Sequence, residues 1–232
     1  YLYSGDWTNA ENAATTVIEA AEYQLEADVN QVFLTGSKEA IWQLYPVITG
    51  LNTVEGFSFI FYSAPYNVAL RNQVVEAFEE GDQRLSSWIG KVTSGSDTFY
   101  YPFKYKVFFS SNLTEYYMVL RLAEQYLIRA EARTQLNKLD GALEDLNRIR
   151  NRAGLDNFSS TSNELVLEAV YKERQRELFA EWGHRWFDLK RTGRANEVLS
   201  LVKPGWQSTD KLFPIPKTEL QINPNMTQNP GY

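Results

Sequence analysis

Apolar residues at helical spacing open the chain. Residues 1–20 predict the end of one helix, a turn at Gly5 and a second helix that Asp6 caps. The inner face of that second helix carries Ala10, Ala14 and Val17. Two small residues on an inner face let a neighbouring helix approach closely, so the pattern predicts a packed helix rather than an isolated one.

The same layout returns in residues 117–154, this time as a complete helix pair with a turn near Asn137 and an expected cap at Asp140. Its inner positions are Tyr126, Ala130, Ala142, Leu146 and Ile149. This small-residue spacing is typical of tetratricopeptide helix pairs. Such a pair cannot bury its apolar face alone, and the first copy has only its second helix. We therefore expect native residues N-terminal to Tyr1.

The residues between the two helix-pair copies follow a different hydrophobic pattern. Residues 39–45 alternate like a short strand, and residues 70–78 resume helical spacing. Residues 47–67 and 94–105 contain glycine, proline and many aromatic residues, which predicts two ring-rich loops. Rings on loops either close a core or offer a platform to a ligand, and closing a core is the commoner role.

A long helix is predicted to begin at a capping box, Thr161 to Glu164, and to be broken or kinked at Gly183. Its apolar face consists of Leu167, Tyr171, Leu178, Trp182, Trp186 and Leu189. Its opposite face alternates carboxylates and guanidiniums: Glu173, Arg174, Arg176, Glu177, Glu181, Arg185, Asp188 and Arg191. Pairs three or four residues apart can bond each other, so we expect a salt-bridge network that fixes helix packing.

The predicted fold is mainly α, with tetratricopeptide-like helix pairs, a loop-rich part with short strands, and an extended C-terminal tail. We expect a single unit with four parts: a half helix pair (1–27), a loop-rich ligand-side region (28–114), a helix pair (115–155), and a long helix with C-terminal framework (156–232). The tail from Lys203 contains five prolines. It is expected to lie across the helices, held by Phe213, Ile215 and Leu220.

Composition excludes several classes of function. The net charge is −6 and no basic block occurs, so a nucleic-acid partner is not expected. The chain has no cysteine and one histidine, and although Glu181 and His184 have the spacing of a dimetal helix motif, such a site needs two copies. We expect no metal and no cofactor. Carboxylates beside arginines should stay ionised, which suits a glycosidase acid poorly.

Several runs together resemble the SusD/RagB family of Bacteroidetes surface glycan-binding lipoproteins. They are ERQRELFAEWGHRWFDLKRTGR, LFPIPKTELQINPNMTQNPGY, RLAEQYLIRAEAR, LNRIRNRAGL, and, at lower specificity, YLYSGDW and YYPFKY. The run GDQR departs at Gln83 from the family's commoner Asp-Pro-Arg. The resemblance spans nearly the entire chain, which looks like a C-terminal portion of a protein about twice as long.

The resemblance implies a non-catalytic nutrient-binding protein on the outer face of the outer membrane, lipid-anchored through a cysteine upstream of this chain. It also implies that the protein caps a TonB-dependent (SusC-like) transporter and delivers an oligosaccharide or polysaccharide, or in some cases a peptide, for uptake. Two alternatives stay open: a helical-repeat scaffold that binds a protein or peptide, and a glycoside hydrolase.

The ligand residues are inferred from sugar chemistry, because sugars present apolar C–H faces for stacking and hydroxyl groups for pairing with planar polar side chains. The 47–67 loop has both kinds of residue. The expected rings are Phe57, Phe59, Phe61, Tyr62 and Tyr66. The expected polar partners are Asn52, Glu55 and Asn67. The second-rank candidates are Trp42, Trp88, Tyr100 and Tyr101.

Overall fold

The computed structural model describes residues 1–65 and 68–232. These residues form two compact units, Tyr1–Trp182 and Gly183–Tyr232. Whether the chain unfolds as the single unit expected from the sequence stays a prediction. No helix in the described residues is both long enough and apolar enough to cross a membrane.

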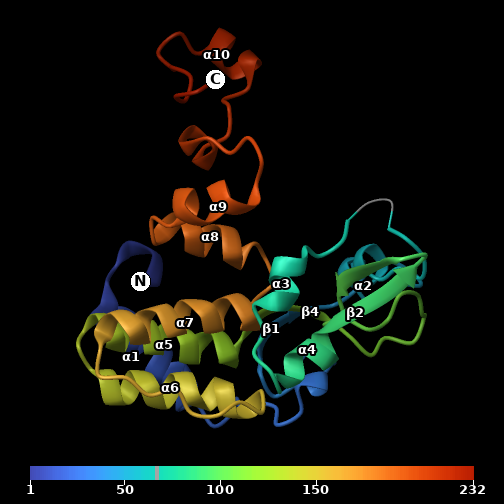
Figure 1. The fold of residues 1–232 in the computed structure, drawn as a ribbon, viewed down its shortest axis with the longest axis vertical. Helices are drawn as coiled ribbons and strands as arrows, with labels where there is room; N and C mark the ends of the chain where they lie inside the picture. The colour runs from blue at the N-terminus through green and yellow to red at the C-terminus, as the bar shows by residue number, and fades with distance from the viewer. Residues whose placement is uncertain (66–67) are drawn as a thin grey trace. The chain divides into compact units, whose positions relative to one another are not determined.

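The first unit has a helical side and a loop-rich side (Figure 1). The helical side is built from α1 (Trp7–Ile18), α5 (Leu122–Gln135), α6 (Leu139–Arg152) and α7 (Asn163–Glu177). The buried positions of these helices include Ala10, Ala14, Ala123, Ala130, Ala142, Leu146 and Ile149. The mainly helical fold and the small-residue packing between helices are therefore confirmed, with Val17 and Tyr126 half-buried at the edges.

The helix caps follow the expected chemistry but not always the expected residue. The Asp6 carboxylate accepts a hydrogen bond from the Asn9 backbone N–H at 3.2 Å, as expected. Helix α6 begins directly after Lys138, so Asp140 is not its cap but an acidic residue in its first turn. The cap of α7 is Ser162, not Thr161. Adjacent hydroxyl residues can cap equally well, so local sequence does not choose between them.

The loop-rich side contains short elements. They are β1 (Ala40–Leu44), α2 (Val54–Phe59), α3 (Asn72–Glu76), α4 (Gln83–Trp88), β2 (Ile89–Ser94), β3 (Asp97–Pro102) and β4 (Tyr117–Arg121), with 3-10 turns at Leu2–Ser4 and Val29–Gln31. The expected strand at 39–45 and helix at 70–78 are confirmed as β1 and α3. The strands form two antiparallel pairs, β1 with β4 and β2 with β3.

Two segments expected to be loops contain regular structure. Most of residues 94–105 belongs to the β2–β3 hairpin, in which Ser94 lies opposite Asp97 and Gly95 adopts a φ of 63° in the turn. The 47–67 segment contains α2, whose first turn is capped when the Thr53 hydroxyl accepts from the Gly56 N–H at 3.0 Å. Both predictions were wrong because the density of aromatic residues hid an alternating strand and a short helix.

Trp88 is the centre of the core on the loop-rich side. Its side chain is fully buried, its ring meets Phe33 edge-on at 5.6 Å, and its Nε1 donates to the Val29 carbonyl at 3.0 Å. Phe33 also meets Tyr105 edge-on at 5.2 Å. Trp88 was expected as a second-rank ligand residue, but these contacts make it a core residue.

The expected break at Gly183 is confirmed, because a new helix begins directly after it at His184, but the preceding helix already ends at Glu177. Ala180 and Trp182 have φ values of 56° and 40°, and Gly183 has 76°, so the backbone leaves the helical conformation across this turn. The expected continuous apolar face is therefore wrong: Trp182 is half exposed. The buried residues of α7 are Val166, Val170, Glu173, Arg174 and Glu177.

The second unit contains α8 (His184–Arg191), α9 (Ala195–Val202), a 3-10 turn (Ser208–Lys211) and α10 (Lys217–Ile222). Its core consists of Leu189, Ala195 and Leu199. The tail from Lys203 thus has more regular structure than expected. One expected anchor is tied locally, because the Gln228 side-chain amide bonds both the N–H and the carbonyl of Ile215 at 2.7 and 2.9 Å.

Candidate functional site

The candidate ligand residues of the 47–67 loop are distributed over different environments. Three of the expected rings line one cavity of about 350 Å³: Phe57, Phe61 and Tyr62. Phe59 and Glu55 line a separate cavity of only about 10 Å³, beside Lys104 and Tyr105. Asn52 is fully buried. Tyr66 and Asn67 lie outside the described residues.

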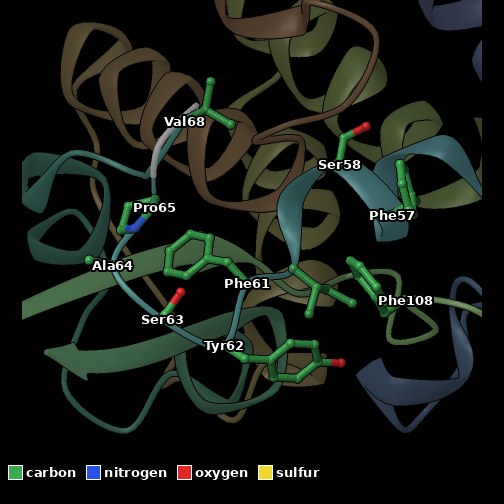
Figure 2. A pocket seen from close by; sticks show the side chains of 10 residues that line it. Phe57, Ser58, Phe61, Tyr62, Ser63, Ala64, Pro65, Val68 and Phe108 are labelled. Atoms are coloured by element: carbon green, nitrogen blue, oxygen red, sulfur yellow. The ribbon is translucent and has the colours of Figure 1, made fainter.

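We call the larger cavity the aromatic pocket (Figure 2). It is lined by Phe57, Ser58, Ile60, Phe61, Tyr62, Ser63, Ala64, Pro65, Val68 and Phe108. In Figure 2 the rings of Phe57 and Phe108 lie on one side, Pro65 and Val68 lie on the other, and Phe61 lies between them. All but Phe108 come from one continuous stretch, so the local course of the chain shapes the pocket.

Phe108 supports the two exposed rings of the pocket. Its ring stacks on Phe57 at a centroid distance of 5.2 Å and meets Tyr62 edge-on at 5.7 Å. Phe57 is 47% exposed and Tyr62 is 75% exposed. A ligand can therefore reach Phe57 and Tyr62, while Phe108 fixes their positions. Sequence reasoning missed Phe108, although it lies in a second uncharged aromatic run, residues 107–114.

Phe61 is supported from behind by Tyr101. The two ring centroids are 4.7 Å apart, and Tyr101 in turn meets Phe103 edge-on at 5.6 Å. A Cβ atom on Gly90 would come within 2.2 Å of the Tyr101 ring, so only glycine fits beneath it. Burial, and secondarily the neighbouring Tyr62 phenol, raise the pKa of Tyr101. Tyr101 was a second-rank ligand candidate, and the structure gives it a supporting position.

Asn52 joins the two segments that form the pocket. Its Oδ1 accepts from the N–H groups of Thr114 and Glu115 at 2.7 and 2.9 Å. Its Nδ2 donates to the carbonyls of Ser110 and Asn112 at 3.2 and 2.9 Å. These four bonds occupy the hydrogen-bonding groups of the amide. Asn52 was expected to pair with sugar hydroxyls, and it instead ties the segment before α2 to the loop after Phe108.

Gly56 brings α2 against the same loop. A Cβ at this position would lie 2.5 Å from the carbonyl oxygen of Val107, so any other residue would push the helix away from residues 107–108. The Val54 N–H at the start of α2 donates to the Tyr117 hydroxyl at 3.0 Å. The position of Phe57 relative to Phe108 is therefore set by backbone contacts on the buried side of α2.

The remaining candidates are not brought to the aromatic pocket. Trp42 lies on β1 beside Leu120 of β4 and is 51% exposed, but it does not line the pocket. Tyr100 is half-buried on β3, opposite Lys91, and forms an isolated bridge with Leu70. Burial raises the pKa of Glu55, whose Oε2 is buried without a hydrogen-bond partner near the small second cavity.

A continuous network of ion pairs links the helical side to the loop-rich side. Within the described part of the chain it contains six cations and six carboxylates: Arg84, Lys104, Arg121, Arg150, Arg152 and Arg176 with Glu39, Glu79, Asp82, Glu173, Glu177 and Glu181. We call it the ionic network. The expected structural role of the carboxylates is thus confirmed, but their main partners come from other elements than α7.

Glu177 is the centre of the ionic network. It is fully buried, and its carboxylate contacts Arg84 at 2.9 Å and both Arg121 and Arg152 at 2.5 Å. Burial alone would raise the pKa of Glu177, but the guanidiniums of Arg152, Arg121 and Arg84 outweigh it and hold the pKa well below the ordinary value. Glu177 therefore stays ionised, as expected, and is unsuited to donate a proton as a glycosidase acid.

Neighbouring cations keep the Glu181 carboxylate ionised in the same way. Its carboxylate bonds Arg121 at 2.9 Å and the Lys104 ammonium at 2.5 Å, and these two cations outweigh burial and lower its pKa. Its oxygens are therefore engaged by cations rather than turned toward a metal position with His184. Within the part of the chain that the structure describes, no group of three or more His, Cys, Asp or Glu residues is placed to hold a metal ion.

Comparison with known proteins decides the family. The model of the SusD family matches residues 57–232. The chain belongs to the SusD family. SusD family proteins are non-catalytic binding proteins.

Two curated relatives share sequence with part of this SusD chain. SusD-like protein P38 of Formosa agariphila is 31% identical over 138 residues, which is 55% of this chain and 27% of the relative. The starch-binding protein SusD of Bacteroides thetaiotaomicron is 34% identical over 122 residues, which is 49% of this chain and 21% of the relative. The chain thus spans about a quarter of the length of the curated relatives it matches.

A solved structure gives the same fold over nearly the whole chain. Surface glycan-binding protein A of Bacteroides thetaiotaomicron, in complex with laminarihexaose, aligns with a TM-score of 0.76 at 22% identity. The alignment covers 98% of this chain and 61% of that one. The mainly helical fold of this chain is therefore shared with that protein.

Proposed function

We propose that this SusD chain binds an oligosaccharide or polysaccharide at the aromatic pocket, as a part of a non-catalytic cell-surface protein. The observation that carries the proposal is the pair of exposed rings, Phe57 and Tyr62, which Phe108 fixes at the edge of a cavity. Rigidly held rings suit stacking against the apolar face of a sugar, because little conformational freedom is lost on binding.

The relatives support this assignment in two ways. One curated relative is a starch-binding protein, and one solved structure of the same fold holds laminarihexaose. The resemblance to the SusD/RagB family adds the setting of the proposal: a lipid-anchored protein at the outer membrane that passes its glycan to a TonB-dependent transporter. Co-purification of the native protein with such a transporter from outer membranes tests that partnership.

Calorimetric titration with a panel of oligosaccharides that includes laminarihexaose tests the binding site. Stacking on one ring contributes about 0.5 to 1.5 kcal/mol beyond burial, so Phe57→Ala or Tyr62→Ala should each weaken binding about 2- to 10-fold. The double variant should bring binding below detection. Both rings are exposed, so helical circular dichroism should not change.

Trp42→Ala is the matched control, because Trp42 is an equally exposed ring that does not line the pocket. If Trp42→Ala weakens binding while the double variant binds like the parent, the glycan is bound on the β1 face and the assignment of the pocket is wrong. If the parent binds a peptide and no oligosaccharide, the chain serves as a helical-repeat scaffold instead.

A further inference from the structure

The aromatic pocket is free of charge to an unusual degree for this chain. Of all residues in the chain, 22% are charged. Yet residues 56–70, which form most of the pocket, and residues 107–114, which supply Phe108, contain no Asp, Glu, Lys or Arg. The polar side chains among the described lining residues are only the hydroxyls of Ser58, Tyr62 and Ser63.

Three charged groups near these segments have contacts away from the pocket. Glu55, directly before the uncharged stretch, lines the small second cavity and not the pocket. Lys104, directly before Tyr105, is buried in the ionic network, where its Nζ bonds Glu181 and the carbonyl of Glu177. Lys106 donates to the carbonyls of Ser87 and Phe103 at 2.6 and 3.1 Å.

From this arrangement we infer that the aromatic pocket is specific for neutral glycans and excludes glycans that carry carboxylates or sulfates. This inference rests on the proposed function, since it names the class of ligand for the same site. A carboxylate or sulfate that leaves water for an apolar cavity loses hydration, and only a nearby cation or several donors can replace it. The net charge of −6 on this chain also disfavours the approach of anions.

Neutral sugars match what the pocket offers. Their C–H faces can stack on Phe57 and Tyr62, and their hydroxyls can pair with the uncharged hydroxyls of Ser58 and Ser63 at the rim. Because no ion pair takes part, binding should depend little on ionic strength, whereas recognition of an anionic glycan through cations would weaken steeply with salt.

The test compares matched oligosaccharides on the parent chain: neutral laminarihexaose, malto- and xylo-oligosaccharides, and for each backbone a counterpart carrying uronic acids or sulfates. We expect the bound members to be neutral, with affinity changing less than about twofold between low salt and 0.5 M NaCl. Each anionic counterpart should bind at least about tenfold more weakly, which corresponds to one uncompensated charged group.

A cation introduced at the pocket tests whether the lack of positive charge causes the exclusion of anionic glycans. Ser63→Lys places an ammonium at the rim of the pocket, where Ser63 is exposed. It should raise the affinity for the anionic counterpart about tenfold and make that binding salt-dependent, while the neutral parent ligand is affected less. Ser86→Lys, at an exposed position of α4, is the matched control and should change neither affinity.

The possible outcomes distinguish a failure of this inference from a failure of the proposed function, glycan binding at the aromatic pocket. If the parent binds an anionic glycan tightly and Tyr62→Ala abolishes that binding, the neutral specificity is wrong while the glycan site stands. If no neutral and no anionic oligosaccharide binds, the proposed function itself is overturned, and the inference with it. If neutral glycans bind but Tyr62→Ala and Phe57→Ala have no effect, the pocket is not the site and the inference about it is wrong.

Discussion

Removal of the Glu177 charge tests whether the ionic network is framework or binding surface. Glu177→Gln keeps the shape of the side chain and removes the negative charge that pairs with Arg84, Arg121 and Arg152. Arg84, Arg121 and Arg152 are all within 2.9 Å of this carboxylate, and the Arg84 and Arg121 side chains are at most 2% exposed. The variant thus leaves buried positive charge without a partner.

The expected loss follows from that burial. Breaking a buried ion pair from one side costs about 3 to 5 kcal/mol, which is a large share of the roughly 5 to 15 kcal/mol that stabilise a typical domain. Urea unfolding followed by circular dichroism should show the transition midpoint at least about 1 M lower, since the slope for such proteins is about 1 to 3 kcal/mol per molar urea.

Glu168→Gln is the matched control for this experiment. Glu168 lies on the same helix, its side chain is 38% exposed, and the Lys172 ammonium is 4.0 Å from its carboxylate. An exposed pair of this kind contributes less than about 1 kcal/mol. If Glu177→Gln is no more destabilising than Glu168→Gln, the reasoning about the network is refuted. If it stays stable but loses the glycan, the network has been assigned to the wrong role.

Three further predictions follow from the structure. Hydrogen bonding from Arg150, aided by Arg176 and opposed by partial burial, lowers the pKa of Glu79 to about 2. The ionised Glu79 should therefore contribute its full stabilisation above pH 4.5, and this contribution should decline as the pH falls from 4.5 toward 2. Urea titrations across that range should show a smaller loss of stability for Glu79→Gln than for the parent, and an equal loss would contradict the prediction. Gly56→Ala should push α2 away from Val107 and weaken glycan binding at least severalfold, unlike Val54→Ala at an exposed position of the same helix; unchanged calorimetric affinity would show that α2 does not position the site. The expected single unit predicts one calorimetric unfolding transition for residues 1–182 and 183–232 together, and two separate transitions would refute it.

The sequence predicted helices well where packing repeats at short range. Ala130, Ala142, Leu146 and Ile149 follow the 3.6-residue period, and all four are buried between α5, α6 and α7. The ionic network shows the opposite case. Glu173, Glu177 and Glu181 were expected from the sequence, but Arg84 and Arg121 are 93 and 56 residues away from Glu177, and no spacing rule relates such positions.

The candidate site was predicted only in outline. The exposed rings Phe57 and Tyr62 were expected, and the structure brings them to one cavity. Asn52 was expected to face a sugar because it is a planar amide in a loop, yet the same amide can satisfy buried backbone groups, and only the fold shows which partners it has. The prediction for Trp88 was wrong for the same reason, because the sequence alone does not show whether an aromatic ring packs in the core or stacks on a ligand.

One short segment couples the framework to the candidate site. Along residues 101–108, Tyr101 and Phe108 support the rings of the pocket, whereas Lys104 enters the ionic network. Tyr105, between them, accepts from the Met118 N–H at 2.9 Å and thereby ties the segment to β4. Lys104 lies three residues from Tyr101 and four from Phe108, so one short segment carries both the ammonium of the network and the two supporting rings. We therefore propose that the ionic network also helps to hold the exposed rings of the aromatic pocket in place.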